Sequence, residues 1–174
     1  MKIFIIGFMG SGKSTCGKEL AAKLGLKFLD LDEQIAAETG RSVGELFDKD
    51  GEEEFRRLEH NALKALLDKD EMVIAAGGGT PCYFNNMELM NRNGITVYLK
   101  MSVDSLVERL SASTADRPLI RNMKGEELKN FITLNLENRE NFYLQAQFKV
   151  KGKNLNMDEL AGFIKNEMGV TNGK

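Results

Sequence analysis

Tryptophan is absent from this chain of 174 residues, and histidine, proline and cysteine are scarce, with one, two and two residues respectively. The two cysteines, Cys16 and Cys82, lie far apart without the spacing of a metal site, so we predict reduced thiols rather than a disulfide. No apolar run is long enough to span a membrane. The apolar run at residues 3–8 is too short for a signal peptide and lacks a small-residue cleavage site. These absences predict a cytoplasmic protein without a membrane partner.

An excess of charge of either sign is also lacking. The chain has 24 lysines and arginines against 26 aspartates and glutamates, which gives a net charge of −2. This balance provides no general attraction to nucleic acid, so we expect no nucleic-acid partner and only local anion sites. With 42% hydrophobic and 29% charged residues, the composition is that of a globular protein. The length predicts a single domain over residues 1–174, and we expect a monomer.

Short apolar runs alternate with amphipathic segments along the chain. The apolar runs predict five buried strands, at residues 2–6, 27–31, 72–76, 95–100 and 148–151. Helical spacing of apolar residues predicts helices at residues 14–24, 33–39, 42–48, 52–67, 86–93, 102–110, 126–145 and 157–168, followed by a frayed tail at 169–174. Strands that alternate with helices pair in parallel, so we predict an α/β fold of three layers, α/β/α, around a five-stranded parallel sheet.

A glycine-rich stretch follows the first predicted strand. Residues 7–14, GFMGSGKS, match the pattern G-x-x-x-x-G-K-[ST]. The glycines let the backbone curl so that N–H groups point at phosphate oxygens, and the following helix adds its positive N-terminal end. Lys13 would reach the β- and γ-phosphates, and the hydroxyl of Ser14 would bind Mg²⁺. A glycine-rich turn that matches by chance is the alternative, but the whole pattern stands between a strand and a helix, as the motif requires.

Two aspartates stand at the end of the second predicted strand, in the sequence FLDLD. Alternate residues of an extended segment point the same way, so Asp30 and Asp32 would lie on one side of the strand end. One carboxylate could hold Mg²⁺ through water while the other accepts hydrogen bonds from substrate hydroxyls. The alternative is that Asp32 only caps the next helix. The two interpretations stay open on the sequence alone.

Two arginines are predicted to lean inward from helices. Arg56 shares a helical stripe with Leu63, whereas Arg57 faces water. Arg139 is aligned in the same way with Ile132 on its own helix. A half-buried arginine needs an anionic partner, and two of them suit a carboxylate or phosphate group that guanidinium can grip bidentately. Internal salt bridges to aspartate or glutamate are the alternative.

Three consecutive glycines, at residues 77–79, follow the third predicted strand. Bare backbone at a strand end allows a substrate ring to approach closely and to accept hydrogen bonds from its N–H groups. A tight turn alone would need fewer glycines. The run therefore favours a small-molecule site beside the phosphate loop.

Together these motifs resemble those of the shikimate kinases. The similarity includes GFMGSGKST at 7–15, LDLD at 29–32, TGRS at 39–42, Phe47, DGEEEFRRLE at 50–59, GGG at 77–79, RPL at 117–119, and Arg139 followed closely by Tyr143. The motifs stand in the family's order and span about residues 1–145. Other small kinases share only the first of them, so the resemblance is specific.

The resemblance implies a kinase that transfers the γ-phosphoryl group of ATP to the 3-hydroxyl of shikimate, with Mg²⁺, in chorismate and aromatic amino acid biosynthesis. It also implies the P-loop NTPase fold of the nucleoside-monophosphate-kinase type. Shikimate-binding helices would lie at about residues 32–60, and a mobile lid at about 112–124. The partners implied are shikimate and ATP.

Residue roles follow from the same resemblance. The residues implied to bind ATP are Gly10, Ser11, Gly12, Lys13, Ser14, Thr15 and Arg117. Those implied to bind shikimate are Asp32, Arg56, Gly78, Gly79 and Arg139, in a pocket walled by Phe47 and Phe55. Catalytic roles fall to Lys13, Asp32 and Arg117, and the metal would be held by Ser14 and Asp30.

The segment 112–124 is polar, has few apolar anchors and carries Arg117 and Arg121. This composition suits a lid that closes over the site and excludes water from phosphoryl transfer. An ordinary surface loop is the alternative. Glu54 is one candidate for holding Arg56 or Arg139 in place, and the single histidine, His60, is expected to be structural.

The sequence departs from the family near the last strand. The run LQAQF at 144–148 lacks an acidic residue, and KGKN at 151–154 differs from the aspartate-threonine type. These differences concern adenine contacts rather than phosphoryl transfer. Two other functions are alternatives: a different small-molecule kinase of the same fold, such as a gluconate kinase, and a nucleotide-binding regulatory module without turnover.

Overall fold

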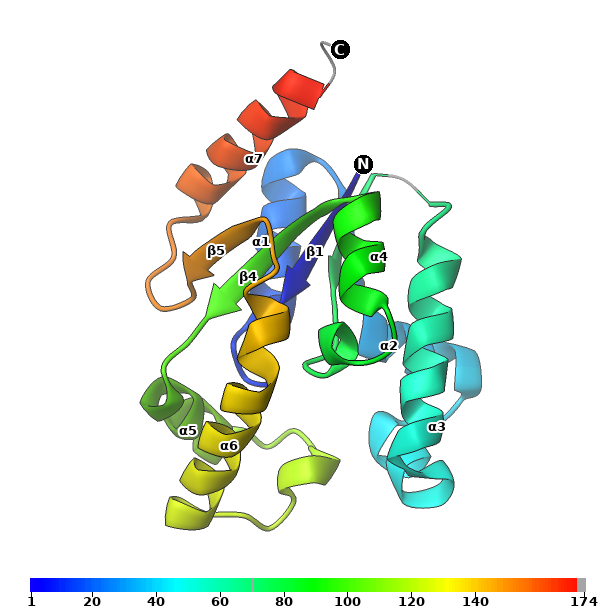
Figure 1. Ribbon diagram of the computed structural model, residues 1–174, viewed down its shortest axis with the longest axis vertical. Helices are drawn as coiled ribbons and strands as arrows, with labels where there is room; N and C mark the ends of the chain where they lie inside the picture. The colour runs from blue at the N-terminus through cyan, green and yellow to red at the C-terminus, as the bar shows by residue number, and fades with distance from the viewer. Residues whose placement is uncertain (70, 172–174) are drawn as a thin grey trace.

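A computed structural model describes residues 1–69 and 71–171 (Figure 1). Five strands form one parallel sheet, as predicted, and their order is β2-β3-β1-β4-β5. They are β1 (Lys2–Ile6), β2 (Lys27–Asp30), β3 (Met72–Ala75), β4 (Ile95–Lys100) and β5 (Phe148–Lys151). β2 ends one residue earlier than predicted because Leu31 already begins a helix.

The helices lie close to their predicted positions. They are α1 (Lys13–Leu24), α2 (Leu31–Thr39), α3 (Val43–Leu66), α4 (Asn86–Asn93), α5 (Val103–Ala112), α6 (Gly125–Tyr143) and α7 (Met157–Thr171), with short 3-10 helices η1 (Thr80–Cys82) and η2 (Pro118–Ile120). The two helices predicted at 42–48 and 52–67 are the two parts of α3, which Gly51 interrupts with a φ of 82°. α7 continues past 168, and residues 172–174 of the predicted frayed tail lie outside the described residues.

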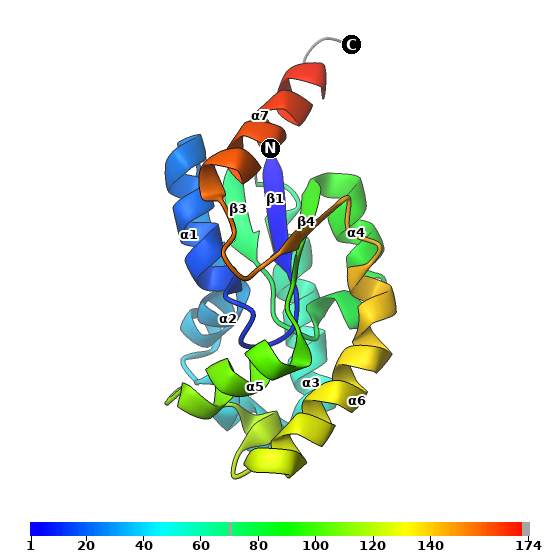
Figure 2. The same cartoon turned by 90° about the vertical axis from the view of Figure 1, so that its left-hand side faces the viewer.

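Two apolar layers cover the sheet. Along β1, Ile3 and Ile5 belong to a core cluster with residues of α1 and α7, while Phe4 and Ile6 belong to a cluster with α3, α4 and α6. All five residues of β1 are buried, as expected for a parallel strand covered on both faces. Figure 2 shows α1 on one side of the sheet and α4 with α6 on the other. The three-layer prediction is therefore confirmed.

The strand order places the candidate site. β1 lies between β3 and β4, so the loops that leave the carboxyl ends of β1, β2 and β3 meet at one edge of the sheet. Ligands of open α/β sheets bind at such a point. In Figure 1 this edge faces downward, between α2 and α3 on one side and α5 and α6 on the other. No helix among the described residues is long and apolar enough to cross a membrane.

Close packing of α1 on β2 depends on Gly17. A Cβ atom at this buried position would stand 2.5 Å from Cε2 of Phe28, a distance that side chains do not tolerate. The missing side chain lets the first turn of α1, with Ser14, approach the end of β2, where Asp30 lies. The hydroxyl of Ser14 donates a hydrogen bond to Asp30 Oδ2.

We expect Gly17→Ala to destabilise the protein although alanine favours helices. Overpacking typically costs ~1–3 kcal/mol, which exceeds the helix propensity gained. Gly162→Ala is the matched control, because Gly162 is also helical, in α7, and its Cβ would have no neighbour within 4 Å. It should stabilise the protein by ~0.5–1 kcal/mol. Urea unfolding measures both free energies, and a stabilising Gly17→Ala would contradict this account of the packing.

Candidate active site

Two adjoining cavities lie at the carboxyl ends of the central strands. The phosphate cavity, of about 320 Å³, is lined by Gly10, Gly12, Lys13, Ser14, Thr15, Asp30 and Arg109. The arginine cavity, of about 260 Å³, is lined by Phe47, Phe55, Arg56, Glu59, Gly79 and Arg139. Both cavities are also lined by Met9, Asp32, Gly77, Gly78 and Arg117. A ligand in one cavity would therefore touch the same wall as a ligand in the other.

The phosphate loop has the backbone that its glycines predict. Gly10 and Gly12 adopt φ values of 79° and 91°, which residues with a side chain rarely adopt. No side chain caps the start of α1 at Gly12, so the first N–H groups of this helix are open to an anion. Ser11 is the one predicted nucleotide residue that does not line the phosphate cavity. It is 2% exposed, and its Oγ has no hydrogen-bond partner among the described residues.

Lys13 lies within this loop. Its Nζ donates a hydrogen bond to the Phe8 carbonyl oxygen at 3.0 Å. Desolvation by burial lowers the pKa of Lys13 to about 8, although the negative charge of Asp32 opposes this change. The ammonium form therefore still dominates near neutral pH and can bind a phosphate oxygen.

The prediction that Asp30 and Asp32 lie on one side of an extended segment is wrong. Asp30 ends β2 and is the N-cap of α2, with its Oδ1 accepting hydrogen bonds from the backbone N–H groups of Asp32, at 3.0 Å, and Glu33. Asp32 lies in the first turn of that helix. The alternation argument was wrong because Leu31 is helical, and the capping role proposed for Asp32 belongs to Asp30. Both aspartates nevertheless line the phosphate cavity.

The environment of Asp32 is unusual for a carboxylate. Its Oδ1 is buried and has no hydrogen-bond partner in the part of the chain that the structure describes. Burial, followed by the nearby charges of Glu59 and Asp30, raises the pKa of Asp32 to about 6, against the opposing effects of Lys13 and Arg56. Such a group binds or releases a proton close to neutral pH, as a general base or acid must.

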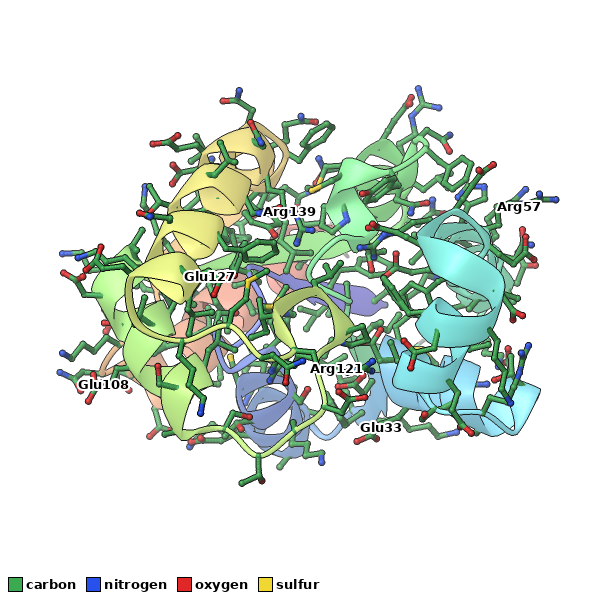
Figure 3. The ribbon with its side chains drawn as sticks, turned by 90° about the horizontal axis from the view of Figure 1, so that it is seen from below. Glu33, Arg57, Glu108, Arg121, Glu127 and Arg139 are labelled. Atoms are coloured by element: carbon green, nitrogen blue, oxygen red, sulfur yellow. The ribbon has the colours of Figure 1, made fainter. Side chains whose placement is uncertain are left out.

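Arg56 is buried and Arg57 is exposed, which confirms the helical prediction. Their side chains are 6% and 61% exposed, and Figure 3 shows Arg57 pointing away from the molecule. Arg56 forms ion pairs with Glu52 and with Glu59, each at 3.0 Å. The alternative of internal salt bridges therefore holds for Arg56. Glu54 pairs with Arg57 at 3.6 Å instead of Arg56, so that interpretation was wrong.

Arg139 has a different environment. It is 8% exposed and forms no salt bridge among residues 1–69 and 71–171. Its Nη1 is buried without a hydrogen-bond partner in the same residues, and its guanidinium carbon lies 5.5 Å from the centroid of the Phe8 ring. In Figure 3 the residue points into the interior from α6. A buried guanidinium in this state suits an anionic ligand in the arginine cavity.

The packing of neighbouring side chains in the protein requires glycine within the run 77–79, apart from any ligand. A Cβ on Gly79 would stand 2.5 Å from the guanidinium carbon of Arg56, and one on Gly77 would collide with the Glu59 carboxylate. Gly78 has its backbone fixed, because the Tyr143 hydroxyl donates a hydrogen bond to its carbonyl oxygen at 2.6 Å. The run therefore makes room for the charged residues and also lines both cavities.

The segment 112–124 lies across the arginine cavity. Arg117 lines both cavities, and its Nε is buried without a partner among the described residues. Burial lowers the pKa of Arg117, while Asp32 opposes this shift. Arg121 forms ion pairs with Asp116 of the same segment at 2.8 Å and with Asp48 of α3 at 3.0 Å. Figure 3 shows Arg121 between the segment and the α2–α3 side.

Glu59 is a site residue that sequence reasoning missed. It is 0% exposed, and besides Arg56 it accepts a hydrogen bond from the Thr80 hydroxyl. Its position three residues after Arg56 on one helix was an available signal. Tyr83, whose hydroxyl donates a hydrogen bond to Glu52 at 3.1 Å, had no sequence signal. His60, expected to be structural, contacts Asn86 through Nδ1 at 2.6 Å.

The divergent segment near the last strand reaches the phosphate loop. Gly152 and Leu155 line a cavity of about 160 Å³ together with Ser11, Thr15 and Arg109. The backbone N–H of Gly152 donates a hydrogen bond to the Lys100 carbonyl oxygen at 2.9 Å, which extends the pairing of β4 and β5 by one residue. This cavity opens beside the start of α1.

The chain is similar to known proteins over nearly its whole length. A family model described as shikimate kinase matches residues 9–168. A shikimate kinase from Parabacteroides distasonis is 46% identical over 145 residues, which are 83% of this chain and 84% of that relative.

Two solved structures share the fold. A shikimate kinase from Bacteroides thetaiotaomicron superposes with a TM-score of 0.89 at 39% identity, covering 97% of this chain and 98% of the other. A shikimate kinase from Acinetobacter baumannii, solved in complex with shikimate, gives a TM-score of 0.86 at 31% identity, covering 99% and 95%. The predicted fold of a P-loop kinase is confirmed.

Replacing Asp32 tests the burial of its carboxyl group. The folded protein binds this proton more tightly than the unfolded chain, whose aspartates have a pKa of about 3.9, so the free energy of unfolding falls as the pH rises from about 4 to about 6. We expect Asp32→Asn to be more stable than the wild type at about pH 7 and to lose this advantage at about pH 4. Urea unfolding at both pH values measures the difference.

Glu33→Gln is the matched control for this prediction, because Glu33 is an exposed acid on the same helical turn. It should change the free energy of unfolding little at either pH. A stability difference for Asp32→Asn that is the same at both pH values would contradict the assignment of a buried, proton-binding carboxyl.

Proposed function

Because the chain belongs to the shikimate kinase family, we propose that it transfers the γ-phosphoryl group of ATP to the 3-hydroxyl of shikimate, giving shikimate 3-phosphate and ADP. The observation that carries this proposal is the placement of Arg56, Arg139 and Asp32 around one cavity that shares a wall with the phosphate loop. A hydroxylated ring acid seated between these groups would have a hydroxyl within reach of the last phosphate of a nucleotide.

Two arginines bind the carboxylate of shikimate in this proposal. Arg56 is already oriented by Glu52 and Glu59, and Arg139 brings an unpaired Nη1. Gly78 and Gly79 offer backbone close to the ring, and Phe47 and Phe55, whose ring centroids lie 4.7 Å apart, form an apolar wall. Carboxylate binding by guanidinium groups in a half-closed cavity fixes the orientation of the ring.

Phosphoryl transfer needs positioning and positive charge more than covalent chemistry. Lys13 and the phosphate loop, Gly10 to Thr15, hold the nucleotide phosphates, and Arg117 reaches the transferred group from the wall shared by both cavities. Asp32 accepts the hydrogen bond of the substrate hydroxyl, and its raised pKa lets it take up the hydroxyl proton. The cavity beside Gly152 and Arg109 would accommodate adenine.

The residues present fit a magnesium ion. Ser14 and Asp30 lie in direct contact at the floor of the phosphate cavity, and a hydroxyl, a carboxylate and phosphate oxygens are ligands that Mg²⁺ prefers. When bound, the ion would add positive charge beside the β- and γ-phosphates. Asp30 would keep its capping role in α2 through Oδ1 while Oδ2 faces the ion.

We also propose that residues 112–124 act as a lid within a single domain, and that the protein works as a cytoplasmic monomer without nucleic-acid or membrane partners. Support for the lid comes from its contacts, since residues 116–119 line the arginine cavity and an ion pair joins Arg121 to Asp48 of α3.

A coupled assay with ATP and three candidate acceptors tests the reaction. We expect phosphorylation of shikimate and little or none of quinate or gluconate. Arg56→Ala should reduce kcat/KM for shikimate about ten- to a hundredfold, since a buried charge-assisted contact contributes ~1.5–3 kcal/mol. Arg57→Ala, which removes an exposed neighbour, is the matched control and should be mild. Equal effects of the two substitutions, or turnover of gluconate instead, would refute the assignment.

Variants of the lid arginines test closure. We expect Arg117→Ala to lower kcat by about a hundredfold, because it removes a cation from the transferred group. Arg121→Ala should raise KM for shikimate only about two- to fivefold, because its ion pairs are partly exposed, and this effect should shrink at about 0.5 M salt. Steady-state kinetics at low and high salt measure both. A lid without function would leave both variants at wild-type rates.

A further inference from the structure

The guanidinium of Arg56 is enclosed by an aromatic ring as well as by its two ion-paired carboxylates. Its Nε and Nη2 donate hydrogen bonds to Glu52 Oε1 at 3.3 and 3.0 Å, and its Nη1 donates to Glu59 Oε2 at 3.0 Å. The ring of Tyr83 lies over it, with its centroid 4.5 Å from the guanidinium carbon. Phe55 and Phe47 are more distant, at 5.5 and 5.8 Å. Tyr83 is therefore the aromatic residue in closest contact with this cation.

These contacts leave part of the guanidinium available. The group has five N–H donors, and the hydrogen bonds to Glu52 and Glu59 use three of them. Two donors are left for the carboxylate of a substrate. Their direction depends entirely on how the plane of the guanidinium is held, because both lie in that plane.

Tyr83 contacts the site in two ways. Its ring covers the guanidinium, and its hydroxyl donates a hydrogen bond at 3.1 Å to Glu52 Oε1, the same oxygen that Arg56 contacts. The Glu52 side chain is 41% exposed, so without this hydrogen bond it would have more rotamers available than the fully buried Glu59 has. Tyr83 thus restrains both the cation and the more mobile of its two anionic partners.

The backbone that carries Tyr83 is itself fixed to the glycine run. Tyr83 follows η1, whose first residue is Thr80. The Thr80 hydroxyl donates a hydrogen bond to Glu59, and the Asn86 side chain donates one to the Thr80 carbonyl oxygen at 2.9 Å. Gly79, just before η1, lies so close to Arg56 that a Cβ would stand 2.5 Å from the guanidinium carbon. The two ends of the stretch 79–83, Gly79 and Tyr83, therefore both confine the guanidinium of Arg56.

We propose that Tyr83 is a positioning residue for shikimate binding, which holds the guanidinium plane of Arg56 and the carboxylate of Glu52 in the orientation that presents two N–H donors to the substrate carboxylate. The proposal rests on the proposed role of Arg56. An aromatic ring suits this task, because it is stiff and its face attracts a cation. Tyr83 itself does not touch the reacting atoms.

Two variants separate the ring from the hydroxyl. Tyr83→Leu removes the stacked face and should raise KM and the calorimetric Kd for shikimate about 5- to 30-fold, with KM for ATP unchanged. Tyr83→Phe keeps the face and loses the hydrogen bond to Glu52, so it should restore most of the affinity, within about two- to fivefold of the wild type. In both variants kcat at saturating shikimate should change much less than KM.

Phe84→Leu is the matched control, because Phe84 is the next residue and stacks on His60 rather than on Arg56. It should leave both KM values unchanged. Thermal unfolding of each variant identifies any general loss of structure. A Tyr83→Leu enzyme whose two KM values and melting temperature all change together, or whose KM for shikimate stays at the wild-type value, would overturn the proposal.

The double variant distinguishes this proposal from the role of Arg56. If Tyr83 acts through Arg56, adding Tyr83→Leu to Arg56→Ala should raise KM for shikimate no further. Additive effects would overturn the proposal while leaving the role of Arg56 intact. Arg56→Ala with an unchanged Kd for shikimate would refute both the carboxylate site and the positioning role of Tyr83.

Discussion

The site is organised around buried charge that the protein does not neutralise by itself. Asp32, Arg117 and Arg139 each keep a buried polar atom without a hydrogen-bond partner among the described residues. A group of this kind costs roughly 1–3 kcal/mol when unsatisfied, and more when it is charged. The cost persists only because the surrounding sheet and helices hold the groups in place. Ligands with a carboxylate, a hydroxyl and phosphate oxygens would satisfy these buried groups. The cost of leaving the groups unsatisfied would then be recovered as binding free energy.

Arg56 and Arg139, the two arginines proposed to bind a carboxylate, have different environments. Arg56 is paired with two glutamates before any substrate arrives, which fixes its direction and keeps its charge satisfied. Arg139 has no such partner in the described part of the chain and depends on the cavity being filled. In the proposed complex, Arg56 would therefore be oriented before the substrate binds, whereas Arg139 would gain an anionic partner only on binding. Positions 77 and 79 require glycine because the side chains of Glu59 and Arg56 occupy the space that a Cβ atom would need.

Much of this arrangement could be predicted from the sequence, since local patterns determine it. The five parallel strands follow from short apolar runs that alternate with helical spacing, and the phosphate loop follows from one contiguous motif. The contrast between Arg56 and Arg57 follows from helical periodicity alone. The capping role of Asp30 was assigned to Asp32, because one residue decides where a strand ends and a helix begins. Glu59 could have been inferred from its spacing to Arg56. Tyr83 could not, because its contact with Arg56 arises from the packing of the segment after β3 against α3, to which no local pattern points.

The break in α3 at Gly51 divides this helix into two arms. Gly51 has a φ of 82°, and a Cβ there would meet no atom within 4 Å, so torsion rather than crowding accounts for glycine at this position. The first arm carries Phe47, which lines the arginine cavity, and Asp48, which forms an ion pair with Arg121 of the segment 112–124. The second arm carries Arg56 and its glutamates. Rotation about the Gly51 backbone would change the position of Phe47 and of the Asp48–Arg121 ion pair relative to Arg56 and Glu59.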